Sequence, residues 1–435
     1  MKRFKYILRA FFALLLIILT TGAQAQDLTT QNDVASSQLQ QQGIDKQLPA
    51  WLDSVDISLL TCGPGQEVWS YYGHTALRIE DHAHGNDLAV NWGMFSFQQD
   101  YFILRFVFGL TDYQIGIFPM SRFIEEYSSE GRWVLQQRLS LTREEKQKIL
   151  AAIDENNKEE NRTYRYNFFY DNCTTRARDM IIKHLGTHDT DFQNVDAHSS
   201  YRTEIHRWNE EHRWARFGND LLLGYMADRP INKAEWEFLP KNLSDDFTTE
   251  ARKDTTSQDE SRVEVFPLKA RYIKLVDSTF YVISPQTELI ESETITPRMV
   301  FIALGVVILL FCAWELRKKR SLWWFDTLLL IATGLPGIIL LVMVFSHHPT
   351  VQINFQMLIL NPLNLLFVWK VSKNMRKGKM HWYYNVWATL LLISLFMQIW
   401  QKYAEGMNIL ALSLLIRYAV KTTMFDLKKY LIKNS

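Results

Sequence analysis

The sequence predicts an α+β domain outside the cytoplasm, followed by an all-α domain of five transmembrane helices. Three observations support this: an N-terminal export signal, mixed strand and helix patterns up to about residue 245, and five apolar runs after residue 297. The chain has 435 residues and a formal net charge of +1, so its charge balance gives no indication of a nucleic-acid partner.

Residues 1–25 have the pattern of a secretory signal peptide. A basic start is followed by an apolar stretch over residues 10–20 and by the cleavage pattern Ala23-Gln24-Ala25. An uncleaved anchor is the alternative, although the apolar stretch is shorter than the roughly 20 residues that a span needs. Residues 26–49 are rich in Gln, Ser and Thr and predict a disordered leader, so the exported domain is expected over residues 50–245.

Strands and helices are expected in mixed order through the exported domain. Leu77 and Ile79 alternate with Ala76 and Arg78, which is typical of a half-buried strand, and His74 stands at the start of this strand. Strands are expected at residues 55–61, 74–79, 88–92 and 132–139, and helices at residues 120–130, 142–156, 173–185 and 201–217.

Asn172 and Cys173 begin one of these helices. Cys173, Ala177, Met180 and Ile181 fall on one side of it at helical spacing, and Asn172 is a good N-cap residue. Cys173 would therefore occupy the first helical position, where free N–H groups and the helix dipole favour thiolate over thiol. This makes Cys173 a candidate nucleophile; the alternative is a small buried cysteine that packs the start of a helix.

The exported domain contains only two cysteines, Cys62 and Cys173, so the sequence does not describe a disulfide scaffold. A single bridge between the two is possible and would abolish a nucleophilic role for Cys173. No His-Glu-x-x-His, Cys-x-x-Cys or Gly-x-Ser-x-Gly motif occurs, so we expect neither a metal site nor a serine nucleophile.

A thiolate nucleophile needs a base, and His74 is the candidate. It begins a strand beside Gly73 in an aromatic and apolar neighbourhood, whereas the other histidines lie in polar loops, on a charged helix or at a helix end. A histidine on a strand facing a cysteine at a helix start is the arrangement of papain-type enzymes, here with the two residues in reversed order. A core histidine is the alternative.

Five apolar runs, at residues 300–314, 322–345, 355–369, 382–399 and 409–420, predict five transmembrane helices over residues 297–423. Basic residues concentrate after the first, third and fifth runs, so the positive-inside rule puts the exported domain outside and residues 424–435 in the cytoplasm. Asn361 and Asn364 are polar for their depth and are expected to bridge helices or to line a cavity. Residues 246–296 read as a linker with a small hairpin.

Three motifs resemble the periplasmic domain of the Lnb-type lipoprotein N-acyltransferases, a family that in turn resembles circularly permuted NlpC/P60-like cysteine enzymes. The motifs are Leu59-Leu60-Thr61-Cys62-Gly63-Pro64-Gly65, Tyr72-Gly73-His74-Thr75-Ala76-Leu77-Arg78-Ile79 and Phe169-Tyr170-Asp171-Asn172-Cys173-Thr174-Thr175-Arg176. The resemblance covers about residues 50–245 and implies a permuted papain/NlpC-P60-like fold for the exported domain. It also implies that Cys173 and His74 are catalytic and explains their reversed order.

The resemblance further implies acyl transfer from a phospholipid to the α-amine of the diacylglyceryl-cysteine of a lipoprotein, without a cofactor, in the inner membrane. The permuted relatives take a third catalytic residue from the next strand, which makes Asn91 the candidate here, with a structural role as the alternative. Candidate substrate-binding residues are Tyr72, Arg78, Tyr170 and Asn172. Arg78 could bind a lipid phosphate or form an ion pair, for instance with Asp171, and Asn172 acts chiefly as a cap.

Two other functions remain open on the sequence alone. One is a periplasmic NlpC/P60-like cysteine peptidase that acts on peptidoglycan or peptides, and the other is a non-catalytic membrane sensor or scaffold. The five apolar runs and the aromatic content of residues 95–118 favour a lipid substrate over the cell wall.

Overall fold

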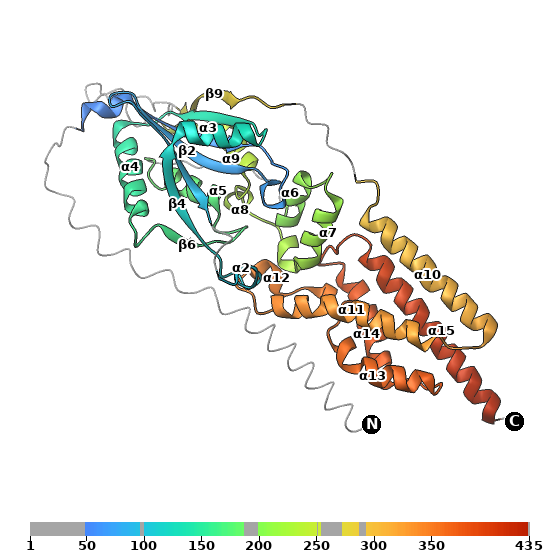
Figure 1. Ribbon diagram of the computed structural model, residues 1–435. Coiled ribbons are helices and arrows are strands. Elements are labelled where there is room, and N and C mark those ends of the chain that lie inside the picture. Colours follow the sequence, from blue (N-terminus) through green and yellow to red (C-terminus); the bar gives the residue numbers. More distant parts are fainter. Residues whose placement is uncertain are drawn as a thin grey trace, which may run out of the picture. The chain divides into compact units, whose positions relative to one another are not determined.

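The computed structural model describes residues 48–95, 100–186, 199–249, 251–253, 272–286 and 293–433 (Figure 1). The predicted signal peptide and residues 26–47 of the predicted leader lie outside the described residues. Residues 50–435 form one compact unit, which contains both the exported domain and the helices of the membrane domain.

An antiparallel sheet of seven strands forms the centre of the exported domain, in the order β6-β4-β3-β2-β1-β5-β9. The strands are β1 (Val55–Cys62), β2 (His74–Asp81), β3 (Asn86–Met94), β4 (Asp112–Pro119), β5 (Val134–Leu139), β6 (Thr163–Arg165) and β9 (Val276–Ile283). Strands alternate with helices along the chain, so the predicted α+β class is confirmed. The central position of β2 fixes His74 at one end of the middle of the sheet.

Helices cover both faces of this sheet (Figure 1). The helices are α3 (Met120–Ser129) on one face, and α4 (Arg143–Asn157), α5 (Cys173–Ile182) and α9 (Pro240–Thr249) on the other. On the α5 face, Ala177 and Ile181 pack against Leu59, Leu77 and Val90 in one buried cluster. This packing sets α5 firmly on β2 and β3, and it brings the start of α5 to the end of the sheet where β2 begins.

The exported domain extends beyond the predicted boundary at residue 245. Strand β9 pairs with β5, from Val134 opposite Ile283 to Leu139 opposite Val276, and so forms an edge of the main sheet. A short pair, β7 (Ala251–Lys253) with β8 (Tyr272–Lys274), precedes it. Strands occur in the segment where a linker with a small hairpin was expected, but residues 276–283 pair with β5 in the main sheet instead of forming a separate hairpin.

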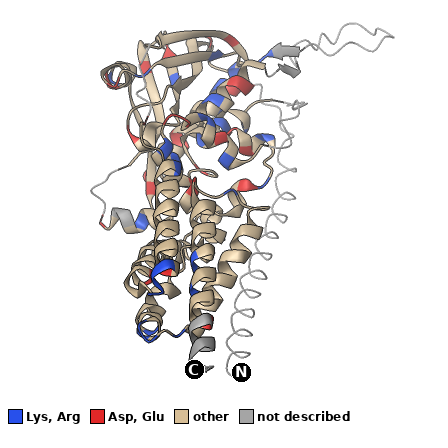
Figure 2. Cartoon of the chain, turned by 90° about the vertical axis from the view of Figure 1, so that its right-hand side faces the viewer, with Lys and Arg blue, Asp and Glu red and all other residues tan. Residues whose placement is uncertain are grey.

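The membrane domain has helical segments at all five predicted runs: α10 (Pro297–Lys318), α11 (Trp323–Met343), a broken segment of α12 (Pro349–Gln352), η4 (Phe355–Leu358) and α13 (Leu363–Arg376), α14 (Trp382–Met397), and α15 (Met407–Lys433). By length and composition, three stretches of the described residues could cross a membrane, namely Pro297–Lys318, Trp323–Met343 and Pro349–Arg376. Figure 2 shows few charged residues along these helices, and it shows Lys and Arg concentrated at the end of the helical bundle where the C-terminus of the chain lies.

Asn364 bridges helices, which is the first of the two expectations for this residue. Its side-chain N–H donates to Thr333 Oγ1 at 2.8 Å, and its Oδ1 accepts from Tyr383 O–H at 2.6 Å. Asn364 is fully buried, so these bonds link α11, α13 and α14 in the interior of the bundle.

Backbone hydrogen bonds join the exported domain to the membrane domain. Gly224 N–H donates to Thr350 C=O at 2.7 Å, and Tyr225 N–H donates to Ile353 C=O at 2.9 Å. A Cβ at Gly224 would lie only 2.1 Å from the Ile353 oxygen, so this close approach requires glycine. The segment between α7 (Arg213–Leu222) and η3 (Tyr225–Asp228) thus lies directly on the ends of the membrane helices.

Two further contacts orient the exported domain. Arg213 at the start of α7 pairs with Glu405, in the connection between α14 and α15, at 2.6 Å. Next to α2 (Phe102–Val107), Phe108 C=O accepts a hydrogen bond from His347 N–H at 2.9 Å. Since His347 follows α11 closely, α2 lies at the end of a predicted span, at the level where the membrane surface is expected.

Four charged side chains are buried together inside the membrane domain. Arg417 on α15 contacts Asp326 on α11 at 2.7 Å and Glu315 on α10 at 3.3 Å, and Lys421 contacts the same two carboxylates at 2.8 and 2.6 Å. Each of the four side chains is fully buried. The net charge of these two cations and two anions is zero, which explains how the fifth apolar run accommodates Arg417.

Arg417→Met is expected to destabilise the protein by about 3–5 kcal/mol, because it leaves two buried carboxylates with one cation. Unfolding of the purified full-length protein in detergent micelles measures this change. The control is Lys148→Met on α4, where an exposed pair with Glu144 is lost and about 0.5 kcal/mol or less is expected. Equal losses in the two variants would contradict a role for the buried cluster in holding α10, α11 and α15 together.

Candidate active site

The start of α5 is fixed by its capping residue, Asn172. Its Oδ1 accepts hydrogen bonds from Thr174 N–H at 2.8 Å and Thr175 N–H at 2.9 Å, and its amide donates to Phe168 C=O and Phe238 C=O. Asn172 is 4 % exposed, so the expected role of a cap, rather than a substrate contact, describes its position. Among the described residues, no hydrogen-bond partner is found for Cys173 N–H, which stays available beside the sulfur.

Two threonines hold the start of α5 against the start of β2. Thr75 Oγ1 and Thr174 Oγ1 are 3.0 Å apart, and both residues are fully buried. The backbone N–H of Thr75 also lies near Cys173 and helps to lower the pKa of its thiol. The half-buried Cys173 therefore lies at the start of β2, next to the side chain of His74.

Asn91 lies on the other side of the His74 ring. Ala76 on β2 pairs with Asn91 on β3, so their side chains lie on the same face of the sheet. Because side chains alternate between faces along a strand, His74, two residues before Ala76, lies on that face as well. The distance between His74 Nε2 and Asn91 Oδ1 is 2.8 Å. The register therefore turns Asn91 towards the histidine.

The same oxygen accepts a hydrogen bond from Gly93 N–H at 2.7 Å. Because a backbone N–H can only donate, this bond identifies the amide atom as the oxygen, and His74 Nε2 must donate its proton to it. The second ring nitrogen of neutral His74, Nδ1, then lacks a proton and can accept one from the Cys173 thiol.

Gly93 makes room for the His74 ring. A Cβ at this position would lie 2.6 Å from His74 Cε1 and 3.1 Å from Asn91 Oδ1. Any other residue would thus push the imidazole away from its two partners. Sequence reasoning missed Gly93, although a glycine inside a strand is a known sign of a close approach.

The electrostatics of the pair favour charge separation. Burial alone would raise the pKa of Cys173, but the charge of His74 and hydrogen bonds from His74, Thr75 N–H and Thr174 lower it to about 7. Burial would lower the pKa of His74, yet the adjacent Cys173 and the bond to Asn91 raise it. A thiolate–imidazolium pair is consequently accessible near neutral pH.

A second thiol lies close by and differs from the first. Cys62 pairs with His74 across β1 and β2, is 1 % exposed, and has its pKa raised by burial to about 12. Both Cys62 and Cys173 are free thiols in this structure. Cys62 therefore has the properties of an unreactive core residue, and only Cys173 has those of a nucleophile.

Tyr127 and Arg132 close the site on the α3 side and were missed by the sequence analysis. The Tyr127 ring stacks on His74 with centroids 6.4 Å apart, and the Arg132 guanidinium lies 4.5 Å from the Tyr127 ring centroid. Arg132 Nε donates to Gly63 C=O at 2.8 Å, which ties the Gly63-Pro64-Gly65 loop to the site. Nothing in their local sequence distinguishes these residues, because helix α3 brings Tyr127 to the site only in the folded chain.

An aromatic wall of Phe95, Tyr113, Tyr164 and Tyr166 stands beside the sulfur. Tyr113 stacks between Tyr166 at 4.1 Å and Phe95 at 4.7 Å, measured between ring centroids. Tyr113, Tyr164, Tyr166 and Cys173 pack in one cluster, so the three rings lie near the sulfur. Burial raises the pKa of all three tyrosines, and the negative charge of Cys173 raises them further. Phe95 and Tyr113 come from the aromatic stretch that, on the sequence alone, favours a lipid substrate.

The four candidate substrate-binding residues have different surroundings. Tyr72 is 8 % exposed, and its hydroxyl accepts hydrogen bonds from Asn209 and Asn219, so it is a packing residue at the membrane end of the domain. Tyr170 is 36 % exposed and lines a groove beside α5. Asn172 is the buried cap described above.

Arg78 does not have the surroundings expected of a phosphate ligand. Its guanidinium is bound to Asp87 at 2.8 Å, to Glu80 at 2.9 Å and to Gln136 at 2.8 Å. The expected partner Asp171 pairs with Arg176 instead, at 2.7 Å. The expected ion pair of Arg78 is thus present, but with Glu80 of the same strand and Asp87 of β3 and not with Asp171, so its positive charge is already balanced by two carboxylates.

Across the described residues, no group of three or more His, Cys, Asp or Glu side chains has the arrangement of a metal site. The polar side chains that meet at Cys173 are a thiol, an imidazole and an amide. These are the components of acyl transfer through a covalent cysteine intermediate.

Comparison with known protein families gives two matches. Residues 47–203 match a family described as the Lnb N-terminal periplasmic domain, and residues 289–429 match one described as the Lnb transmembrane domain. A search of curated proteins and a search of solved structures gave no significant match. The two matched regions include Cys173, His74, Asn91 and all five helical segments of the membrane domain.

Gly93→Ala is expected to raise the pKa of Cys173, because the added methyl group displaces the imidazole that stabilises the thiolate. In the native protein the rate of Cys173 alkylation by iodoacetamide should rise with pH through a midpoint near 7. In the variant this midpoint should move up by at least about one pH unit, which lowers the rate at pH 7 at least about fivefold.

The matched control is Gly218→Ala on α7, where an added Cβ meets no atom within 4 Å. Its alkylation profile should equal that of the native protein, and Cys173→Ala should remove the labelling. An unchanged midpoint in Gly93→Ala would show that the position of the His74 ring does not control the thiol.

Proposed function

The chain belongs to the Lnb family of lipoprotein N-acyltransferases, since its exported and membrane domains match that family in chain order, and on this premise we propose that Cys173 carries the acyl group. The donor is a phospholipid of the membrane, and the acceptor is the α-amine of a diacylglyceryl-cysteine at the N-terminus of a lipoprotein. The observation that carries the proposal is the line of Cys173, His74 and Asn91.

In the first half-reaction His74 Nδ1 takes the thiol proton, and the Cys173 sulfur attacks an ester carbonyl of the phospholipid. The tetrahedral oxyanion accepts a hydrogen bond from Cys173 N–H, at the positive end of α5. The carbon–oxygen bond of the ester then breaks, and the imidazolium gives its proton to the leaving alcohol. The products are a lysophospholipid and an acyl thioester on Cys173.

In the second half-reaction the neutral α-amine of the acceptor attacks the thioester carbonyl. His74 takes the proton that the nitrogen loses, the carbon–sulfur bond breaks, and the thiolate of Cys173 is regenerated. Asn91 acts as the positioning residue, because its oxygen holds Nε2–H and so keeps Nδ1 towards the sulfur in both steps.

The surroundings of the site support a lipid donor. Tyr72, two residues before His74, packs in one cluster with Met343 and Val351 of the membrane domain, so the catalytic end of the sheet faces the membrane. Beside His347, α2 exposes Tyr101 by 79 % and Leu104 by 55 %, which suits contact with lipid. An acyl chain that leaves the bilayer here meets the aromatic wall next to Cys173.

The charge pattern supports a location in the inner membrane with the C-terminus in the cytoplasm. Lys and Arg occur where α10 ends, around the end of α13 and along α15, whereas the connections at the opposite ends of the bundle carry the contacts to the exported domain. By the positive-inside rule, the exported domain then lies in the periplasm, next to the outer leaflet of this membrane.

The competing reaction of a thioester is hydrolysis, which would make the protein a thioesterase or a peptidase. The buried aromatic wall and the membrane-facing position limit the access of water, and they favour transfer to an amine. The two outcomes are separable by experiment, because peptidase activity would change peptidoglycan or peptide fragments rather than lipoprotein acylation.

Cys173→Ala is expected to lower N-acylation of lipoproteins by at least about a thousandfold, because no other group can carry the acyl chain. The measurement is mass spectrometry of lipoprotein N-terminal peptides, in cells that lack other N-acyltransferases and express the full-length protein. Cys312→Ala on α10 is the matched control and should retain triacylated lipoproteins, since this thiol lies in the membrane domain.

Unchanged triacylation in Cys173→Ala would refute the proposed function. Loss of peptidoglycan or peptide cleavage, with lipoproteins unaffected, would indicate the hydrolase instead. Biological function that is retained without Cys173 would indicate a sensor or scaffold.

A further inference from the structure

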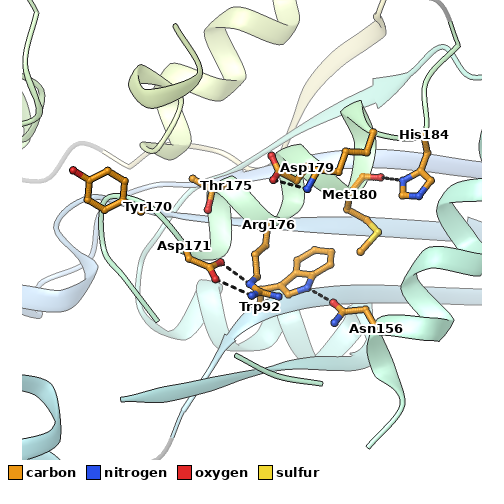
Figure 3. Close-up of a pocket in the computed structure, with 10 residues that line it drawn as sticks. Trp92, Asn156, Tyr170, Asp171, Thr175, Arg176, Asp179, Met180 and His184 are labelled. Carbon is orange, nitrogen blue, oxygen red and sulfur yellow. Dashed lines mark hydrogen bonds and ion pairs between the residues drawn. The ribbon is translucent and has the colours of Figure 1, made fainter. Parts of the chain in front are cut away.

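A groove of about 420 Å³ runs along one side of α5 (Figure 3). Tyr170 and Asp171 lie at one end, before the helix, and Lys183 and His184 lie at the other end, after it. Its volume is in the range of ligand-binding pockets. The proposed chemistry at the sulfur uses none of the residues that line it.

The groove overlaps the helix face on which Cys173 stands, although Asp179 and Lys183, which also line it, lie about 120° and 80° from Cys173 around the axis. At 100° per residue, Arg176, Met180 and His184 lie within about 60° of Cys173 around the axis of α5, and the first two of these side chains point into the groove in Figure 3. Arg176 also lies 3.6 Å from the centroid of Tyr164, a ring of the aromatic wall beside the sulfur. The groove therefore starts beside the residues just before Cys173 and follows α5 away from the thiol.

The groove has an even balance of charge. Arg176 binds Asp171 through two hydrogen bonds of 2.7 and 2.8 Å, and Lys183 pairs with Asp179 at 3.0 Å. A lipid phosphate is best held by an excess of positive charge, which these mutual pairs do not provide. Carboxylate, guanidinium and ammonium groups side by side instead offer acceptors and donors together, as a peptide main chain requires.

Apolar surface and length also suit a peptide. The indole of Trp92, held by a hydrogen bond from its Nε1 to Asn156 Oδ1 at 2.8 Å, and the side chain of Met180 form the apolar floor. From Thr175 to His184 the groove follows the helix for about 13 Å at a rise of 1.5 Å per residue. An extended chain covers this distance with about four residues.

We propose that this groove binds the first residues of the acceptor lipoprotein, namely the extended peptide that follows its lipid-modified cysteine. The inference rests on the proposed function and names where that substrate lies. With the α-amine at the Cys173 thioester, the second to fifth residues of the acceptor run along α5 towards His184. The diacylglyceryl group stays at the membrane end of the domain, where Tyr72 meets the membrane helices.

The test compares two acceptors with purified full-length protein in phospholipid vesicles. One is diacylglyceryl-cysteine amide, which cannot reach the groove, and the other is a diacylglyceryl-cysteinyl pentapeptide, which fills it. The native protein should show a higher kcat/KM for the pentapeptide. Two variants should lower the ratio of kcat/KM for the pentapeptide to kcat/KM for the amide at least about fivefold, mainly through a higher KM for the pentapeptide. Met180→Trp fills the groove, and Lys183→Glu removes an exposed cation from its end.

Lys148→Glu on α4 is the matched control, because its ammonium is similarly exposed and paired but lies outside the groove; its ratio should equal that of the native protein. Lys183→Glu tests the groove even if Met180→Trp fails to fold, because the Lys183 side chain is 68 % exposed and its replacement should not disturb the core. Equal kcat/KM values for the two acceptors in the native protein, or an unchanged ratio in both groove variants, would overturn the inference.

A binding measurement separates failure of the groove from failure of the proposed function. If the native protein acylates neither acceptor, the proposed function fails, and the groove is tested in Cys173→Ala by photo-crosslinking. A benzophenone side chain in place of Lys183 should capture the pentapeptide at least about fivefold more than one in place of Lys148. Equal capture at the two positions would refute peptide binding in the groove.

Discussion

The contact between the start of α5 and the start of β2 is the constraint on which the site depends. Asn172 caps the helix, Thr174 reaches across to Thr75, and the N–H of Thr75 helps to lower the pKa of Cys173. These contacts are local, but together they place His74, at the start of β2, beside Cys173, at the start of α5, although the two residues are 99 positions apart in the chain. The lowered pKa of Cys173 follows from this junction, because burial alone would have raised it.

Contacts with the membrane domain orient the exported domain and therefore the junction between α5 and β2. Backbone bonds at Gly224 and the ion pair of Arg213 with Glu405 fasten the exported domain to the connections between the helices. The end of the sheet that carries His74 thus faces the helices of the membrane domain, while α5 and the groove beside it lead away from the sulfur. On the proposed function, a thioester on Cys173 would lie between a lipid donor on one side and a peptide acceptor on the other. In the interior of the bundle, the charges of Arg417, Lys421, Glu315 and Asp326 cancel within one buried cluster.

Local patterns predicted the parts of the site that local chemistry determines. The helix start at Cys173 was predictable from its cap residue, and the five apolar runs were predictable from composition. Asn91 needed the register of β2 with β3, which the family resemblance suggested and the pattern alone could not settle. Gly93, Tyr127 and Arg132 were missed, because their role comes from side-chain packing between distant segments. For Arg78 the ion-pair alternative holds, but with Glu80 of its own strand and Asp87 of β3 in place of Asp171.

We propose that Cys173 is the acyl carrier, and intact-protein mass spectrometry of the full-length protein after incubation with phospholipid and no acceptor tests this directly. We expect a mass increase of one acyl chain, located on Cys173, removed by neutral hydroxylamine as a thioester is, and lost when an amine acceptor is added. Acylation of the acceptor with no adduct on Cys173 at any time would show that the acyl group does not pass through this thiol.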